Sequence, residues 1–258
     1  MKEAVLRLGF ISFVVVLVLF GLVVLLAQVQ DPAGVRRHQA LNHLAPIELW
    51  NSFSASANKG FKAVVNGKKT ITGLHLYPSK NFWLASSRRA DTTYFTKKDL
   101  KENRYIKWSV LLQKYPKQRF FAYVHSQNPV DLFRFIKVSE KHKGRLLIYS
   151  DFLKTAAWFR KEAPLMALGA SPTVLLRMNF FSKLWLEGLV PVRAHFAYIA
   201  KPRIGFAVMK ELKRRNIVVM LSQNLVKGEK KTTKKFREFI KNTFPKKMYS
   251  LVIENNGI

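Results

Sequence analysis

The sequence contains no cysteine, which excludes disulfides, thiolate metal ligands and a cysteine nucleophile. Acidic residues are also scarce: 15 Asp and Glu stand against 45 Lys and Arg, so the net charge is 45 − 15 = +30. No GxGxxG or GxxxxGK[ST] motif supports a nucleotide-binding α/β fold. No Gly/Ser-rich linker or block of charge divides residues 40–258, and we therefore expect one domain there.

Hydrophobic residues make up 48% of the chain, which is too much for a disordered basic tail and predicts a folded core. A charge of +30 predicts an anionic partner or surface, and nucleic acid, acidic lipid head groups and lipopolysaccharide phosphates all qualify. Charge spread over the surface for solubility is the alternative. A mixed-sign surface would serve that purpose with less self-repulsion.

Residues 9–27 read GFISFVVVLVLFGLVVLLA, a run without charge that has the length of a transmembrane helix. Lys2 and Arg7 precede it, so residues 1–8 are expected to form a cytoplasmic tail. No A-x-A pattern follows, which favours an uncleaved anchor over a cleaved signal peptide. We therefore expect a single-pass membrane protein, with a polar stalk at 28–39 and an extracytoplasmic domain, periplasmic or on the outer face, at 40–258.

Short apolar runs alternate with helical patterns after residue 40. This alternation predicts a parallel sheet with helices outside it. About eight strands over this length favour a single (β/α)8 TIM-like barrel in the α/β class, and an open doubly wound sheet is the alternative. The expected strands are 63–65, 70–77, 81–86, 119–125, 145–149, 165–168, 190–200, 217–221 and 249–253, and the expected helices are 129–139, 151–161, 205–215 and 230–244.

A series of short motifs runs through 43–258 in a fixed order. They are His43 followed by Asn51 and Ser52, the run 73–83, the segment 148–152 followed by Pro164, Leu168 and Gly169, and finally Asn224 after an apolar strand. In this order they resemble the glycerophosphodiester phosphodiesterase-like (phospholipase C-like) family of barrel enzymes. The resemblance implies a TIM barrel, phosphoric diester hydrolysis in lipid metabolism, and a calcium or magnesium cofactor.

The family's metal ligands do not carry over to this chain. In the family, two carboxylates on the second strand hold the cation, and calcium or magnesium needs hard oxygen ligands. The aligned positions here are Gly73 and His75, and the third-strand glutamate falls within 119–125, which holds no carboxylate. We therefore expect a catalytically inactive barrel, a pseudoenzyme with no metal cofactor, that binds anionic lipid head groups or phosphorylated envelope components.

A histidine-based site is the alternative, and it would make the protein an active phosphodiesterase. Cleavage without metal needs acid–base groups around a phosphate and cations to stabilise charge. His195 also lies on an expected strand, and each histidine could equally be a surface or core residue. The candidate acid–base residues are His43, His75 and His125, and the candidate phosphate-binding residues are Lys80, Arg88, Arg89 and Arg193.

Lys and Arg cluster along the chain, for example at 213–215 and 234–235. Such clusters suit a membrane surface with anionic lipids. A nucleic-acid partner is disfavoured because the expected anchor exports the domain. The remaining hypothesis is a basic interaction subunit of an envelope complex that contacts an acidic protein partner.

Overall fold

Parallel strands pair side by side into a closed ring in the computed structural model of the chain. Within the described residues the ring has eight strands, because the order β1-β10-β9-β8-β7-β6-β5-β2 is closed by a pairing between β1 and β2. These strands are β1 (Ile47–Trp50), β2 (Ile71–Pro78), β5 (Arg119–Val124), β6 (Leu146–Tyr149), β7 (Ala167–Ala170), β8 (Phe196–Ile199), β9 (Val218–Ser222) and β10 (Tyr249–Asn255). The structure describes residues 2–29, 41, 47–50, 71–86, 105–199, 204–222 and 249–255.

Two further strands extend the ring beside β2. β3 (Trp83–Ser86) pairs antiparallel with β2, and β4 (Ile106–Lys107) pairs antiparallel with β3. The short helix α4 (Trp108–Lys114) then leads into β5. The closed ring confirms the predicted α/β barrel and excludes the open doubly wound sheet.

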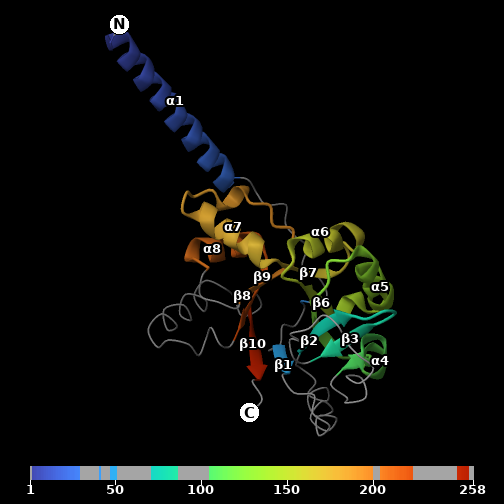
Figure 1. The fold of residues 1–258 in the computed structure, drawn as a ribbon. Coiled ribbons are helices and arrows are strands. Elements are labelled where there is room, and N and C mark those ends of the chain that lie inside the picture. Colours follow the sequence, from blue (N-terminus) through green and yellow to red (C-terminus); the bar gives the residue numbers. More distant parts are fainter. Residues whose placement is uncertain are drawn as a thin grey trace.

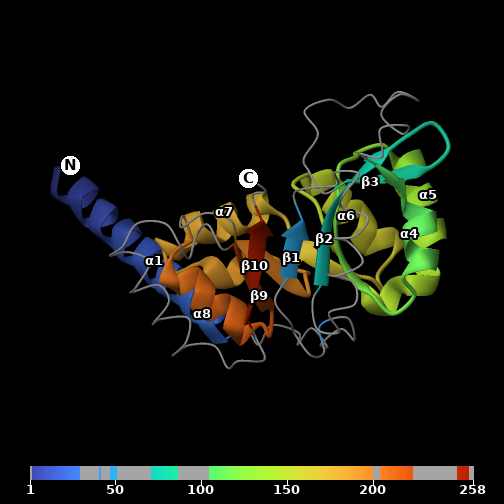
Figure 2. The same cartoon turned by 90° about the horizontal axis from the view of Figure 1, so that it is seen from below.

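Helices follow the strands and cover the outside of the ring. Figures 1 and 2 show α4, α5 and α6 over one side of the barrel, and α7 and α8 over the other. They are α5 (Pro129–Ser139), α6 (Leu153–Glu162), α7 (Pro172–Ser182) and α8 (Phe206–Arg214), with the 3₁₀ turns η2 (Glu140–Arg145) and η3 (Glu187–Leu189) after α5 and α7. The expected strand 63–65 and the expected helix 230–244 lie outside the described residues.

Side chains alternate along each strand between the barrel interior and the surrounding helices, as the two-residue period of a strand requires. Large side chains fill the interior: Phe121, Tyr149, Phe196 and Tyr198 form one buried cluster. Gly169 lies under two of these rings, since a Cβ atom there would be 2.7 Å from Phe196 and 2.8 Å from Tyr149. The interior is therefore a packed core rather than a pore.

The N-terminal residues form one long helix, α1 (Lys2–Val29), which extends away from the barrel (Figure 1). Nowhere in the described part of the chain is a helix long and apolar enough to cross a membrane. This finding overturns the predicted transmembrane anchor at 9–27 and the single-pass, extracytoplasmic localisation derived from it.

Candidate functional site

Two of the predicted histidines meet where β2 and β5 end, at the carboxyl side of the barrel. His75 lies on β2 opposite Tyr123 of β5, and His125 follows directly after β5. The backbone N–H of His125 donates to the carbonyl of Leu76 at 2.9 Å, which extends the pairing past the end of β5. The His75 Nδ1 and His125 Nε2 atoms are 2.8 Å apart and hydrogen-bonded, so one nitrogen donates and the other accepts. Functional sites of this fold lie at this end of the barrel.

Tyrosine rings surround this histidine pair. The His125 ring stacks on Tyr77, with 4.7 Å between centroids, and on Tyr123, with 4.6 Å between centroids. The His75 ring lies 5.0 Å from the Tyr123 ring. Each histidine shares a strand face with one tyrosine two residues away, as Cβ alternation requires. Stacking on both tyrosines holds the His125 imidazole in one orientation.

A second polar pair, Tyr149 and Asp151, lies beside the histidines at the end of β6. Tyr149 is buried, and its ring contacts Tyr123 and Tyr198 edge-on. Burial raises the pKa of the Tyr149 hydroxyl well above its ordinary value. The charge of Asp151, the neighbouring Tyr198 and a hydrogen bond to the Asp151 carboxylate raise it further. Tyr149 therefore stays protonated at neutral pH and acts there as a hydrogen-bond donor.

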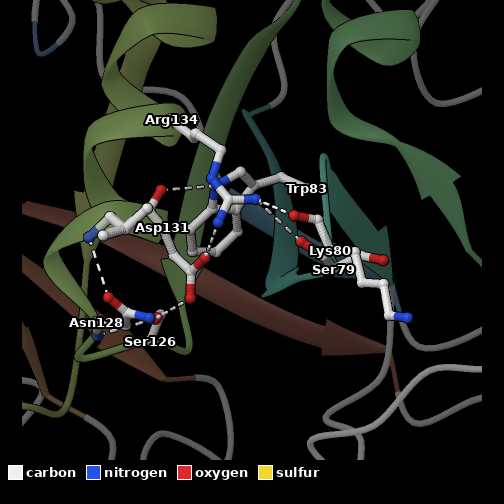
Figure 3. Close-up of polar contacts among 8 residues, drawn as sticks. Ser79, Lys80, Trp83, Ser126, Asn128, Asp131 and Arg134 are labelled. Atoms are coloured by element: carbon white, nitrogen blue, oxygen red, sulfur yellow. Dashed lines mark hydrogen bonds and ion pairs between the residues drawn. The ribbon is translucent and has the colours of Figure 1, made fainter.

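A hydrogen-bond network fixes the two loops that leave the histidine pair (Figure 3). Arg134 of α5 pairs with Asp131 at 2.8 Å and donates to the backbone carbonyls of Ser79 and Lys80 in the turn between β2 and β3. Asp131 also accepts a 3.4 Å hydrogen bond from Ser126, the residue after His125. The network therefore joins the turn beyond β2 to the loop beyond β5.

Asn128 and Trp83 complete this network. The Asn128 Oδ1 atom accepts from the backbone N–H of Val130 at 3.0 Å and so caps α5, whose first residue is Pro129. Trp83 of β3 donates from Nε1 to the carbonyl of Asp131 at 3.0 Å. The start of α5 is thereby held against β3. Both lie beside the carboxyl end of the barrel, which we call the mouth.

The other predicted site residues do not all join this pair. Lys80 is exposed in the β2–β3 turn, on the same side of the barrel as the histidines, and in Figure 3 its side chain points away from the network. Arg193 is exposed and precedes β8, so it lies toward the opposite, amino-terminal end. His195 is also at that end, where its Nδ1 accepts from the backbone N–H of Leu168 at 3.1 Å. His43, Arg88 and Arg89 lie outside the described residues.

The residues at the mouth do not fit calcium or magnesium, the metals that the sequence resemblance implies. These hard cations take oxygen ligands, usually carboxylates, at six or more positions. The β2 positions that the sequence resemblance aligns with these carboxylates hold Gly73 and His75, and Tyr123 of β5 lies opposite His75. No group of three or more His, Asp or Glu side chains that could hold a metal ion occurs in the described ranges. The absence of a cofactor stays a prediction.

Comparison with solved structures identifies the class of fold. No protein-family model and no curated protein matches this chain. A putative glycerophosphodiester phosphodiesterase from Galdieria sulphuraria superposes with a TM-score of 0.57 at 11% identity, covering 82% of this chain and 94% of that one. A putative glycerophosphoryl diester phosphodiesterase from Silicibacter pomeroyi gives 0.53 at 5% identity, covering 88% and 93%. The chain therefore has a glycerophosphodiester phosphodiesterase-like barrel fold.

A third similar structure contains a ligand. It is a phosphodiesterase from Oleispira antarctica in complex with the product sn-glycerol-3-phosphate, with a TM-score of 0.52 at 9% identity, covering 83% of this chain and 94% of that one. At such identities the similarity concerns the fold alone. The expected fold family is thus confirmed, and the chemistry of this chain depends on its own residues.

The tyrosines around the histidine pair were not among the predicted site residues. A sequence signal for them exists, since the strands read His75-Leu76-Tyr77 and Tyr123-Val124-His125. In each strand the two-residue spacing places a His and a Tyr on the same face. Pairing these two strands is enough to predict a His–Tyr cluster at their carboxyl ends.

Proposed function

We propose that this barrel binds an anionic phosphorylated ligand at its mouth and does not perform the metal-dependent hydrolysis that the sequence resemblance implies. The observation that carries the proposal is the hydrogen-bonded pair of His75 and His125, stacked with Tyr77 and Tyr123, on the strands where metal-binding carboxylates would lie. Imidazole N–H and phenol O–H groups donate hydrogen bonds to phosphate oxygens without any metal ion.

The charge of the chain supports an anionic ligand. The net charge is +30, and Lys80 is exposed in the turn on the same side as the histidine pair. A phosphate drawn toward this surface would meet the Lys80 ammonium at the rim and the hydrogen-bond donors of the histidine cluster inside it. We propose the phosphorylated head group of a lipid, or another phosphorylated envelope component, as the ligand class.

Metal-independent phosphodiester cleavage is the second candidate function, and the same histidine pair is the observation that favours it. One histidine can accept the proton of an attacking hydroxyl while another group donates a proton to the leaving oxygen. The second histidine of the pair is the donor that this candidate would use. This candidate requires that turnover be indifferent to chelators and lost when the pair is broken.

One set of measurements on the full-length chain separates these functions. Calorimetric titration with sn-glycerol-3-phosphate in the presence of EDTA is expected to show binding, and His125→Gln should weaken it by about tenfold or more, as the loss of a hydrogen bond to a charged group does. His142→Gln is the matched control, because His142 lies in η2 and bonds Arg145 instead. Binding that is unchanged by His125→Gln, or absent altogether, would contradict the proposed site.

Turnover of glycerophosphocholine is measured alongside binding. We expect none above background, with or without magnesium or calcium. Turnover that survives EDTA and disappears in His125→Gln would establish the second candidate. Turnover stimulated by a divalent metal would refute both functions, because neither uses one.

A further inference from the structure

An exposed apolar turn lies where α7 ends and η3 begins. It is on the other side of the barrel from α5 and its Arg134–Asp131 network. We define this turn surface by Phe180, Leu184, Trp185 and Leu189, whose side chains are 62%, 44%, 64% and 43% exposed. Large apolar side chains that gather on a surface mark a contact with another molecule or with a membrane.

The tip of this turn is strained as well as exposed. Trp185 has a φ of 55°, in the left-handed region that bulky residues rarely adopt. Strained residues persist only where the surrounding structure holds them, and they concentrate at functional sites. Trp185 combines this strain with an exposed fraction of 64%, so packing within the fold does not account for a tryptophan at this position.

The surrounding structure holds the turn rigidly. Leu186, the residue after Trp185, is buried, and its backbone N–H donates to the carbonyl of Phe181 at 3.0 Å. Arg215 at the end of α8 donates to the carbonyls of Gly188 and Val190 at 2.8 and 2.7 Å. The exposed rings are therefore presented by a fixed backbone.

The charges beside the turn surface are mostly positive. Arg177 and Lys183 are both exposed on or just after α7. Glu187 of η3 is half-buried, and one of its carboxylate oxygens is buried. α1 contacts η3, and its described side chains are apolar and nearly all exposed, so apolar exposure on this side extends beyond the turn.

We infer that this turn surface docks onto an anionic lipid bilayer. Tryptophan, phenylalanine and leucine flanked by lysine and arginine are the composition that inserts at the boundary between head groups and acyl chains. Trp185 and Phe180 enter the interface, while Arg177 and Lys183 attract the anionic head groups. This contact is separate from ligand binding at the mouth.

The absence of cysteine in the chain permits a direct test, because a single introduced cysteine can be labelled specifically. Trp185→Cys in the full-length chain, labelled with an environment-sensitive fluorophore, should show a blue shift and a several-fold rise in emission on vesicles of phosphatidylglycerol and phosphatidylcholine. Val130→Cys on α5 is the matched control, since Val130 is 61% exposed and Trp185 is 64% exposed. Leu184→Cys provides a second label position should Trp185→Cys fold poorly.

A second comparison does not depend on labelling. Phe180 and Phe133 are both 62% exposed, but Phe133 lies on α5, away from the turn. Phe180→Ser should lower the fraction of protein that sediments with anionic vesicles, and Phe133→Ser should leave it unchanged. Equal responses at positions 185 and 130, or the same response on pure phosphatidylcholine, would overturn the inference. No response at 185 to any vesicle would also overturn it and would assign the turn to a protein partner.

Discussion

The buried ion pair at the end of α8 offers a sharp test of how the barrel is held together. Glu211 accepts hydrogen bonds from Nε of Arg215 at 2.6 Å and from Nε of Arg214 at 2.7 Å. The side chains of Glu211 and Arg215 are only 8% and 7% exposed. Arg215 also donates to backbone carbonyls of the segment that contains η3, so the pair joins α8 to that segment.

Glu211→Gln should therefore destabilise the protein strongly. It leaves the Arg215 guanidinium buried without a counter-charge, and removing one partner of a buried pair costs about 3–5 kcal/mol. For a chain of this size, each kcal/mol shifts the melting temperature by about 2–4 °C, so we expect a drop of roughly 6–20 °C. The matched control is Glu162→Gln, whose 3.3 Å pair with Lys161 has side chains 40% and 84% exposed. It should cost about 0–1 kcal/mol.

Urea and thermal unfolding of the full-length chain, followed by circular dichroism, measure both variants. A loss for Glu211→Gln within about 0.5 kcal/mol of the Glu162→Gln loss would refute the reasoning, because an exposed pair and a buried pair would then be equivalent.

The pH dependence provides an independent check on the same pair. Burial raises the pKa of Glu211. Hydrogen bonds from Arg214 and Arg215 and their positive charges lower it by more than burial raises it, so the pKa lies below its ordinary value. The folded carboxyl therefore binds its proton less readily than the unfolded one. Its stabilisation is present above the unfolded pKa and is lost as pH falls through the folded pKa. The stability gap between the native chain and Glu211→Gln should close in acid, and a constant gap down to about pH 3 would contradict this.

Two further predictions concern the barrel interior. Gly169→Ala should destabilise the fold by about 1–3 kcal/mol, because the new Cβ would lie 2.7 Å from the Phe196 ring and 2.8 Å from the Tyr149 ring. Gly21→Ala meets nothing within 4 Å and should leave the melting temperature unchanged, and equal melting of the two variants would count against the packing argument. Tyr149→Phe should reduce the loss of stability above about pH 10, since the raised pKa of Tyr149 means that the unfolded chain releases this proton first. Identical alkaline unfolding curves for the native chain and Tyr149→Phe would exclude that contribution.

The sequence predicted those helices and strands whose ends or hydrophobic period are marked by neighbouring residues. The helix expected at 129–139 has those bounds in the structure, because Asn128 caps it and Pro129 begins it. The helix α7 was missed, since apolar side chains such as Leu176 and Phe180 lie on its exposed side and blur the helical period. The strand β1 was also missed. It has four residues, one of them Glu48, and is defined by pairing with strands at both ends of the barrel sequence.

In the candidate site, too, single residues could be predicted from the sequence, but contacts between distant segments could not. His75 and His125 were predicted as residues, but their 2.8 Å contact depends on the register between β2 and β5, which lie 50 residues apart. The contact of Arg134 with the turn at Ser79 has no local signal for the same reason. The transmembrane prediction relied on the uncharged apolar run at 9–27, the cations before it and the missing cleavage pattern after it. It was wrong, because no described helix is long and apolar enough to cross a membrane.

The rate accelerations that such groups can provide favour binding over hydrolysis at this end of the barrel. A positioned acid–base group contributes about 10²–10⁴ in rate, and one preorganised donor to a developing charge adds about 10²–10³. The His75–His125 pair with one such donor would then supply a rate acceleration of roughly 10⁴–10⁷, at the low end of the 10⁶–10¹⁷ range of enzymes. The several kcal/mol that a divalent metal adds by polarising phosphate need oxygen ligands, and β2 and β5 present imidazole and phenol instead. The same donors bind a phosphate in its ground state at no such disadvantage, so the mouth of this barrel is better suited to holding a phosphorylated ligand than to cleaving it.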